Sequence, residues 1–325
     1  MMDTPWDFGV HKELGEVESR IMESIESHEP LLHEIAAYVI ESGGKRLRPT
    51  VAILAFKASG GKDPARVIDL AAAFELIHSA TLIHDDINDG GESRRGRESA
   101  YRKYGIQNAL VTGDFLYVKG FGIGGKFPPP IVDLTAEVCA ALAEGEIGQK
   151  KHEGDVDLTR EEYLDIIRRK TALPISASAQ SGAMLAGAAQ SVVLDMADYG
   201  VNLGLAFQIV DDVLDITGDP KVLGKPVGTD IREGNITLPA INALENGGAV
   251  NREELIRILK RRRKTEDHVR KAMQIIEKSG AVEKTLSDAK SFMKLAKDSL
   301  RDIPHSNPYR AEMERLADFI VKRNR

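Results

Sequence analysis

Two acidic clusters of the same form occur in the chain, Asp85-Asp86-Ile87-Asn88-Asp89 and Asp211-Asp212-Val213-Leu214-Asp215. Carboxylates at positions i, i+1 and i+4 of a helix place the first and last on one face, about 5.4 Å apart. Six such carboxylates would repel one another without cations. Oxygen-only clusters suit Mg²⁺, which binds a few carboxylates and completes its shell with water and substrate phosphates. The duplication therefore indicates a magnesium–diphosphate site built from two helices.

A solvated acidic face is the alternative interpretation of each cluster. Both clusters stand among Leu, Ile and Val residues. Buried carboxylates without a counter-charge are costly, so the metal-site interpretation is favoured.

Basic residues flank the clusters. Arg94 and Arg95 follow the first cluster in GGESRRG, and guanidinium groups bind phosphate oxygens through forked donors. Upstream, the segment 43–49 (GGKRLRP) combines a glycine pair, which permits close backbone approach, with Lys45 and Arg48. Alone, a basic helix start would explain this segment equally well. Together with Arg94 and Arg95 it would form a second, metal-free diphosphate pocket.

Composition narrows the class of protein. The 325 residues are 42% hydrophobic, with a net charge of −6 and a pI near 5.8, which argues against nucleic acid as a partner. Cys139 is the single cysteine, and the opening MMDTPWDFGVHKELG has no apolar signal core. We therefore expect a cytoplasmic protein. The apolar segment Ile68–Ile83 contains charged residues and falls short of the ~20 apolar residues of a spanning helix, so no transmembrane segment is expected.

Helical periodicity covers nearly the whole chain. Apolar residues recur at spacings of three and four in Leu31–Ile40, Ile68–Ile83, Ile131–Ile147, Tyr163–Leu173, Val192–Ile216, Leu255–Leu259 and Met273–Ile276. Breakers cluster at 60–64, 124–130 and 218–228, and Pro128-Pro129-Pro130 predicts a loop. The pattern predicts one all-α domain over residues 1–325.

These motifs resemble the trans-polyprenyl diphosphate synthases, the group that contains farnesyl, geranylgeranyl and longer-chain synthases. The similarity extends nearly end to end through GGKRLRP, ELIHSATLIHDDIND with GGESRRG, NALVTGDFL, AEGEIGQ, RRKTALPISASA and FQIVDDVLDITGDPKVLGKPVGTDIREGNITLP. The resemblance implies an isoprenoid-synthase-type helical bundle around a deep central cavity, and a homodimer. It also implies a Mg²⁺-dependent condensation of isopentenyl diphosphate with an allylic prenyl diphosphate, with three ions bound alongside substrate.

The resemblance assigns roles to individual residues. The metal ligands would be Asp85, Asp86, Asp89, Asp211, Asp212 and Asp215. The isopentenyl diphosphate would be held by Lys45, Arg48, His78 and Arg95. The allylic diphosphate would be held by Arg94, Lys170, Thr171, Gln208 and Lys225, of which Lys170 and Lys225 would also stabilise the leaving group.

Plainer interpretations stand beside several of these roles. His78 lies on an apolar helix face, where a satisfied core histidine is common. Gln208 would serve equally as a buried packing amide, and Thr171 as a partner for local backbone. Any one lysine is more often a solvated surface charge. Asn235 stands where the family usually has a second lysine, so it supplies no positive charge there.

Product length is predicted from the helix that precedes Asp85. In the family, bulky residues four or five positions before this aspartate stop growth early, whereas Thr81 and Ala80 are small. Each helical turn of ~5.4 Å is about one isoprene unit long. The pattern predicts a geranylgeranyl or longer product, with a deeper floor formed by Ile77, Phe74 or a neighbouring helix that bears Phe115, Leu116 or Phe121.

Rival functions come from other classes. A terpene cyclase or head-to-head condensing enzyme usually lacks a second full aspartate triplet together with GGKRLRP, and both are present here. A catalytically silent regulatory subunit typically loses one acidic cluster or the basic residues. A non-enzymatic helical scaffold would need no matched metal sites.

Overall fold

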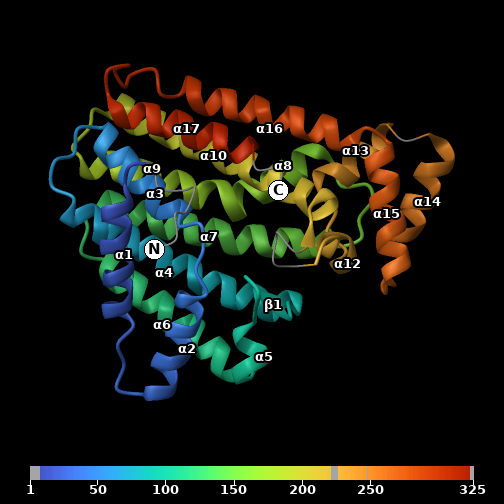
Figure 1. Cartoon of the computed structure of the whole chain (residues 1–325), viewed down its shortest axis with the longest axis horizontal. Coiled ribbons are helices and arrows are strands. Elements are labelled where there is room, and N and C mark those ends of the chain that lie inside the picture. Colours follow the sequence, from blue (N-terminus) through green and yellow to red (C-terminus); the bar gives the residue numbers. More distant parts are fainter. Residues whose placement is uncertain (1–7, 221–225, 247, 323–325) are drawn as a thin grey trace. The chain divides into compact units, whose positions relative to one another are not determined.

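The protein is described by a computed structural model covering residues 8–220, 226–246 and 248–322. Its contacts divide the chain into two compact units: residues 1–137, 174–200 and 299–316 form the first, and 138–173, 201–298 and 317–325 the second. The secondary structure of the described residues is almost entirely helical (Figure 1). The expected all-α class is therefore confirmed, and a single domain over 1–325 stays a prediction.

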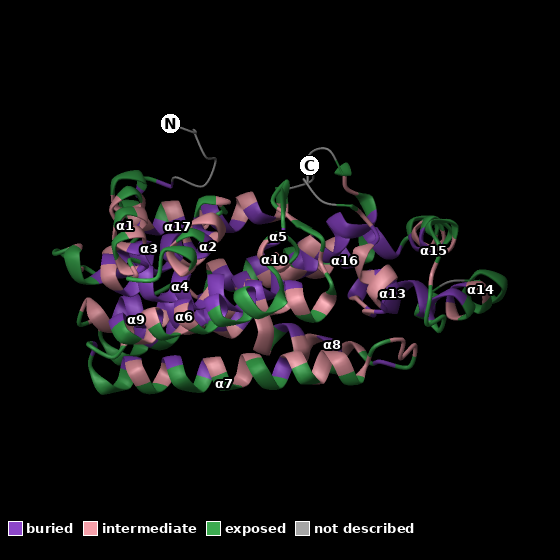
Figure 2. Cartoon of the chain, turned by 90° about the horizontal axis from the view of Figure 1, so that it is seen from below, coloured by how far each residue is buried: buried purple, intermediate pink, exposed green. Residues whose placement is uncertain are grey.

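The first unit contains the first acidic cluster. Its elements are α1 (His11–Ser24), α2 (Pro30–Glu41), α3 (Leu47–Ala58), α4 (Ala65–Asp89), β1 (Ser93–Arg94), β2 (Arg97–Glu98), α5 (Ala100–Tyr104) and α6 (Ile106–Gly124). Helix α4 packs against α1, α3 and α6 and is buried along most of its length (Figure 2). Gly120 of α6 leaves space for Ile77 of α4, because a Cβ at this glycine would lie 2.8 Å from the Ile77 side chain.

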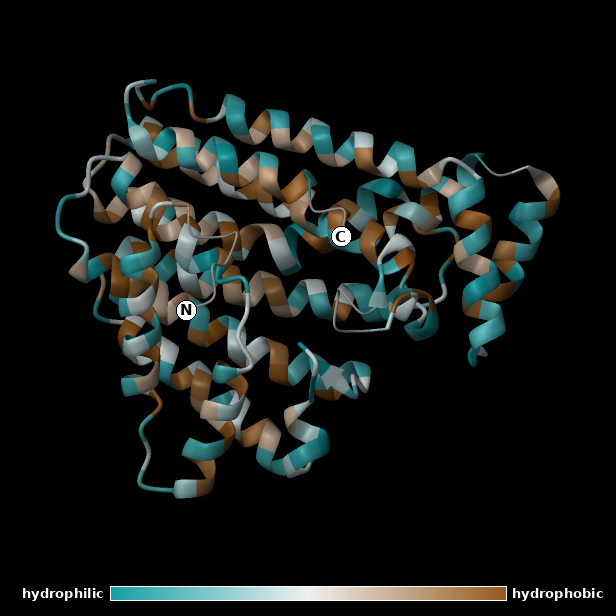
Figure 3. Ribbon diagram, in the orientation of Figure 1, coloured by the Kyte–Doolittle hydropathy of each residue, from teal (hydrophilic) through white to brown (hydrophobic). Residues whose placement is uncertain are grey.

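The second unit contains the second acidic cluster. Its elements are α8 (Arg160–Ile167), the π-helix η1 (Arg168–Ala172), α12 (Thr229–Glu233), α13 (Leu238–Asn246), α14 (Ala249–Leu259), α15 (Glu266–Lys278) and α16 (Ala281–Asp298). Helices α7 (Pro129–Lys151), α9 (Leu173–Leu185), α10 (Gln190–Thr217) and α17 (Pro308–Lys322) contribute residues to both units. Alternating hydrophilic and hydrophobic turns along α16 follow from its amphipathic sequence (Figure 3).

The predicted helices are confirmed, and one predicted loop is corrected. Pro128-Pro129-Pro130 was expected to lie wholly in a loop, but α7 begins at Pro129. Proline is compatible with a first helical turn because the first backbone N–H groups have no intrahelical partner there. Among the described residues, α4 has the length and hydropathy of a membrane span, and 72% of that window is buried inside the protein, as in a core helix.

Candidate functional site

The first acidic cluster forms the last turn of α4, which ends at Asp89 and is followed by Gly90 in the left-handed conformation (φ 68°). Asp85 and Asp89 are half-buried, whereas Asp86 is only 7% exposed. The Arg94 guanidinium donates to Asp86 Oδ1 from Nε at 2.7 Å and approaches it with Nη2 at 2.6 Å. Burial raises the pKa of Asp86, and the Arg94 charge opposes that shift. The structure therefore joins one predicted metal ligand to one predicted phosphate ligand.

A short hairpin presents Arg94 and Arg95. Strands β1 and β2 pair Ser93 with Glu98 and Arg94 with Arg97. The two loop residues, Arg95 and Gly96, both have positive φ, 55° and 76°, which is the signature of a type I′ turn. Arg95 therefore stands at the tip of the turn while Arg94 remains in the strand beside Asp86.

The glycine pair at 43–44 lies against the tip of this hairpin. A Cβ on Gly44 would lie 2.5 Å from Arg95 Nη2, and Gly44 itself has φ 146°. Arg95 also approaches the Ser42 hydroxyl, with Nη1 at 3.5 Å. These contacts bring the GGKRLRP segment to the arginine hairpin, as the sequence predicts for a diphosphate pocket.

A pocket of about 30 Å³ opens beside these groups, with Ser42, Asp86, Arg94 and Arg95 in its wall. Its other lining residues are Tyr38, Val39, Ser79, Leu82, Ile83, Arg97, Glu98, Ser99 and Ala100.

Arg95 of the hairpin acts electrostatically on both Arg48 and His78. Burial lowers the pKa of Arg48 to about 10, so its guanidinium stays protonated at neutral pH. Burial, followed by repulsion from Arg48 and Arg95, lowers the pKa of His78 well below its usual value. A neutral imidazole offers one N–H donor to an anion without adding to the repulsion among the arginines. Lys45 lies in the loop before α3 and is exposed.

The second acidic cluster lies on α10, near its C-terminal end. Asp212 is 3% exposed, and both of its oxygens are hydrogen-bonded: Tyr163 OH donates to Oδ2 at 2.6 Å and Gln208 Nε2 to Oδ1 at 2.8 Å. Burial raises the pKa of Asp212 to about 7, although both hydrogen bonds act in the opposite direction. Asp211 is half-buried, and Asp215 is buried.

Tyr163 is positioned by the start of α8. The Thr159 hydroxyl accepts from the backbone N–H of Glu162, whose side chain accepts from the Thr159 N–H, and together they form a capping box. This cap places Tyr163 in the first turns of α8, where its phenol reaches Asp212.

The π-helix η1 carries Lys170 and Thr171. Thr171 Oγ1 donates to Gln208 Oε1 at 2.8 Å, so Thr171, Gln208 and Asp212 form one hydrogen-bond chain. A π-turn inserted between helices is often found at functional sites, because it changes the direction of side chains within a continuous helical segment.

Lys170 faces the C-terminal turns of α7. Its ammonium donates to Gln149 Oε1 at 2.7 Å and forms an ion pair with Glu146. The lysine is therefore held by α7 on one side and by the π-turn on the other.

Asp215 binds the backbone at the start of α12 (Thr229–Glu233). Its carboxylate accepts from the backbone N–H groups of Thr229 and Asp230, at 3.2 and 3.0 Å, at the start of α12. Lys225, predicted to bind the allylic diphosphate, lies outside the described residues. The Asn235 amide donates to Glu233 Oε2 at 3.2 Å.

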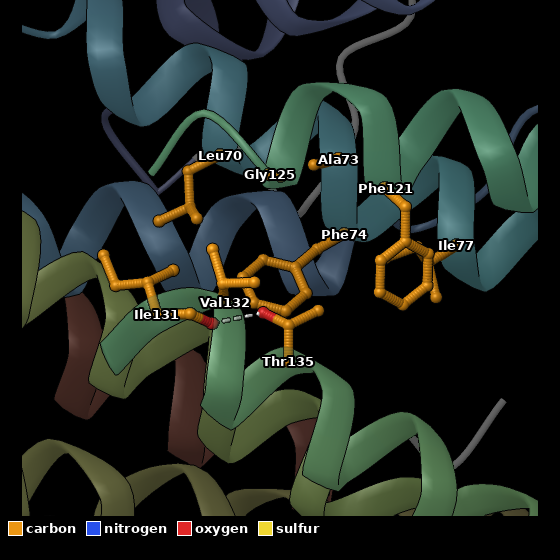
Figure 4. A pocket seen from close by; sticks show the side chains of 10 residues that line it. Leu70, Ala73, Phe74, Ile77, Phe121, Gly125, Ile131, Val132 and Thr135 are labelled. Carbon is orange, nitrogen blue, oxygen red and sulfur yellow. Dashed lines mark hydrogen bonds between the residues drawn. The ribbon is translucent and has the colours of Figure 1, made fainter. Parts of the chain in front are cut away.

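An apolar pocket of about 10 Å³ lies between α4, the end of α6 and the start of α7 (Figure 4). Phe74, Ile77 and Phe121, three residues predicted as a floor, line it. The other lining residues are Leu70, Ala73, Gly124, Gly125, Ile131, Val132 and Thr135. Ala80, Thr81, Phe115 and Leu116 lie outside its wall. The space holds about one water, so a prenyl tail enters only if the bulky side chains move.

Within the described residues, no group of three or more His, Cys, Asp or Glu side chains is arranged to hold a metal ion. The chemistry of the donors still suits Mg²⁺, since Asp85 and Asp89 supply hard oxygens one turn apart, near Arg94 and Arg95.

Comparison with known proteins identifies the family. A sequence model described as Polyprenyl synthetase matches residues 29–276. The chain belongs to this family. A short chain isoprenyl diphosphate synthase of Methanothermobacter thermautotrophicus is 37% identical over 312 residues, which cover 94% of this chain and 95% of that one. An octaprenyl diphosphate synthase of Escherichia coli is 33% identical, with 97% of each chain covered.

A solved structure supports the same conclusion. A polyprenyl synthase from Caulobacter crescentus, crystallised with calcium and isoprenyl diphosphate, matches with a TM-score of 0.94 and 36% identity, covering 98% of this chain and 97% of that one. The expected isoprenoid-synthase-type helical fold is confirmed. This polyprenyl synthetase family member is therefore a prenyltransferase.

Two features of this polyprenyl synthetase, a hairpin and a buried tyrosine, were not predicted from its sequence. The hairpin 93–98 was not predicted because two-residue strands are too short to show an alternating pattern. The sequence Arg94-Arg95-Gly96-Arg97, with glycine at the second turn position, is the local signal that indicates a hairpin turn there. Tyr163 carries no local signal, because its partner is 49 residues away.

Proposed function

We propose that the enzyme condenses isopentenyl diphosphate with an allylic prenyl diphosphate to give an all-trans polyprenyl diphosphate of geranylgeranyl length or longer. The contact between the Arg94 guanidinium and Asp86 carries this proposal, because it sets a forked phosphate donor beside a cluster of carboxylates at a helix end. Full-length similarity to enzymes of this class supports it.

The isopentenyl diphosphate pocket is proposed to consist of Lys45, Arg48, His78 and Arg95. Mutual electrostatic effects among Arg48, Arg95 and His78 support this grouping. A diphosphate group would relieve the repulsion between these cations, so binding is strengthened by the charge already collected there.

The allylic diphosphate is proposed to bind Arg94, Lys170, Thr171, Gln208 and Lys225. Asp86 orients the Arg94 guanidinium, while Gln149 and Glu146 hold the Lys170 ammonium. Thr171 and Gln208 are already joined by a hydrogen bond, so they act as a unit.

Mg²⁺ is the proposed cofactor, with three ions held alongside substrate by Asp85, Asp86, Asp89, Asp211, Asp212 and Asp215. When bound, the ions neutralise charge on the departing diphosphate. Asp86 and Asp212 are buried and already hold Arg94, Tyr163 and Gln208, so their main part is to position these donors. The half-buried Asp85, Asp89 and Asp211 are the more accessible oxygen donors.

The chemistry follows from these placements. The C–O bond of the allylic diphosphate breaks, and its electron pair leaves with the diphosphate, whose charge Arg94, Lys170 and Lys225 stabilise. The isopentenyl double bond attacks the resulting allylic cation, forming a C–C bond. A proton then leaves the neighbouring carbon to the released diphosphate, and a new double bond forms. Apolar side chains exclude water from the cation.

Product length is proposed to depend on the apolar pocket of Figure 4. Phe74 lies eleven residues before Asp85 on α4, which corresponds to about 16 Å, or roughly three isoprene units at one per turn. Ala80 and Thr81, which lie between Phe74 and Asp85, are too small to act as a floor nearer the aspartate.

The enzyme is proposed to be a cytoplasmic homodimer. The outer face of α6 exposes Ile106, Leu110, Val111 and Val118, the last with 70% of its surface exposed. These residues follow a helical spacing along α6, and a second copy of the chain would cover them.

The decisive experiment supplies the isolated protein with isopentenyl diphosphate, Mg²⁺ and each allylic primer, followed by product-length analysis. Elongated all-trans products are expected. A silent regulatory subunit would consume no isopentenyl diphosphate, and a terpene cyclase would release cyclic hydrocarbons from an allylic diphosphate alone. Either result would exclude the proposed function.

A further inference from the structure

Arg46 lies just before α3, and its side chain contacts three other helices, α1, α2 and α4. It is the N-cap residue of α3, and its guanidinium binds Glu18 of α1 through Nε and Nη2. Nη2 also donates to the backbone carbonyl of Ile40 in α2 at 3.0 Å, and Nη1 to Glu75 Oε1 in α4 at 2.7 Å. Only a planar, multi-donor cation can satisfy all of these acceptors at once.

The backbone at Arg46 adopts an uncommon conformation. Arg46 has φ 47° and ψ 38°, in the left-handed region. For a residue with a side chain this conformation is strained. Gly43 and Gly44 in the same loop also have positive φ. The contacts of the Arg46 side chain offset the strain and hold the loop in this path.

The contact with Glu75 is the buried part of this arrangement. The Arg46 side chain is 10% exposed and that of Glu75 is 3% exposed. Burial alone would lower the pKa of Arg46, but the charges of Glu75 and Glu18 outweigh burial and raise it. Breaking a buried ion pair by removing one partner leaves an uncompensated charge and is strongly destabilising.

Glu75 also acts on the proposed diphosphate pocket. It lies one helical turn before His78 on α4. Its charge raises the pKa values of Arg48 and Arg95, partly offsetting the effect of their burial. One buried carboxylate thus serves as counter-charge to three arginines and directly fixes one of them, Arg46.

We propose that Arg46 and Glu75 are positioning residues whose ion pair fixes the 43–46 loop and the start of α3, so that Lys45 and Arg48 reach the diphosphate of isopentenyl diphosphate. Neither residue touches substrate. The inference rests on the proposed function, because the pocket that the loop completes is the proposed isopentenyl diphosphate site. The strength of diphosphate binding then depends on the geometry of this loop, which is set by an ion pair that does not itself contact the ligand.

The test is Arg46→Lys, which keeps the charge but cannot reach three helices at once. The KM for isopentenyl diphosphate is expected to rise about tenfold or more, since a small misplacement of binding groups is costly. The KM for the allylic substrate and kcat should stay unchanged. Glu75→Gln, a neutral isostere, should give the same split.

Glu13→Gln is the matched control. Glu13 and Lys57 form another mostly buried ion pair, between α1 and α3, away from the loop. This variant should lose thermal stability without a change in either KM. The inference is overturned if Arg46→Lys and Glu75→Gln leave the KM for isopentenyl diphosphate unchanged, or raise both KM values equally. If the unsubstituted enzyme consumes no isopentenyl diphosphate, the proposed function itself has failed.

Discussion

Arg94 places two guanidinium nitrogens within 2.7 Å of one carboxylate oxygen of Asp86. This contact links the acidic end of α4 to the first strand of the hairpin that follows it. The pair therefore bears on both the proposed metal site and the proposed phosphate-binding arginines.

Asp86→Asn is expected to lower kcat about a hundredfold or more, because it frees Arg94 and removes one charge from the acidic cluster. Steady-state kinetics at saturating Mg²⁺ provide the measurement. Asp69 lies on the same helix as Asp86 and pairs with Arg20 of α1, so Asp69→Asn is the control and should retain activity. Normal turnover of Asp86→Asn would contradict the role assigned to the pair.

Thr171→Val is expected to lower kcat without unfolding the enzyme. Valine matches threonine in shape but cannot donate to Gln208, which then loses the partner that orients it toward Asp212. Losing one hydrogen bond costs about 1 kcal/mol, or roughly a fivefold effect on rate. Thr217→Val removes a hydroxyl that bonds only the backbone of its own helix, and it should have little effect on kcat. Equal rates for the two variants would show that the chain does not contribute.

How far the sequence predicts this structure depends on the range of each interaction. Most of α4 was predicted, because the apolar spacing over Ile68–Ile83 lies within a single helix. The contact between Tyr163 and Asp212 was not, since it requires packing between helices distant in sequence. Arg46 stood within a recognised motif, yet only the fold shows that it binds Glu75.

His78 gives the ligand-free enzyme a pH-dependent stability. Burial and nearby arginines lower its folded-state pKa, while in the unfolded chain it takes up a proton as pH falls through about 6.5. The unfolded state then binds more protons, so the free energy of unfolding decreases as pH falls below about 6.5, by up to ~1.4 kcal/mol per pH unit. This contribution is absent above that range.

Chemical denaturation of the ligand-free enzyme between neutral and mildly acidic pH measures this effect. His78→Gln should remove that part of the slope, because glutamine does not titrate. An identical slope in the variant and the unsubstituted enzyme would show that His78 is protonated equally in both states.

Phe74→Ala is expected to lengthen the product, and Ala80→Phe to shorten it. The first change opens the floor of the apolar pocket, and the second adds bulk about one turn from Asp85. Product-length analysis with a fixed primer measures both. Leu116→Ala is the control: Leu116 is fully buried on α6 but does not line the pocket, so its truncation should cost stability, about 2–5 kcal/mol, with unchanged products. Unchanged products in both test variants would place the floor elsewhere.

Val118→Asp is expected to weaken self-association of the enzyme. Val118 is the most exposed of the apolar residues on the outer face of α6, and burying an unpaired carboxylate in an interface is unfavourable. Sedimentation velocity should show a dimer for the unsubstituted enzyme and a concentration-dependent shift toward monomer for the variant. Val250→Asp, at an exposed valine of α14, is the control because it adds the same charge away from α6. A Val118→Asp protein that remains as dimeric as this control would place the homodimer contact on another surface.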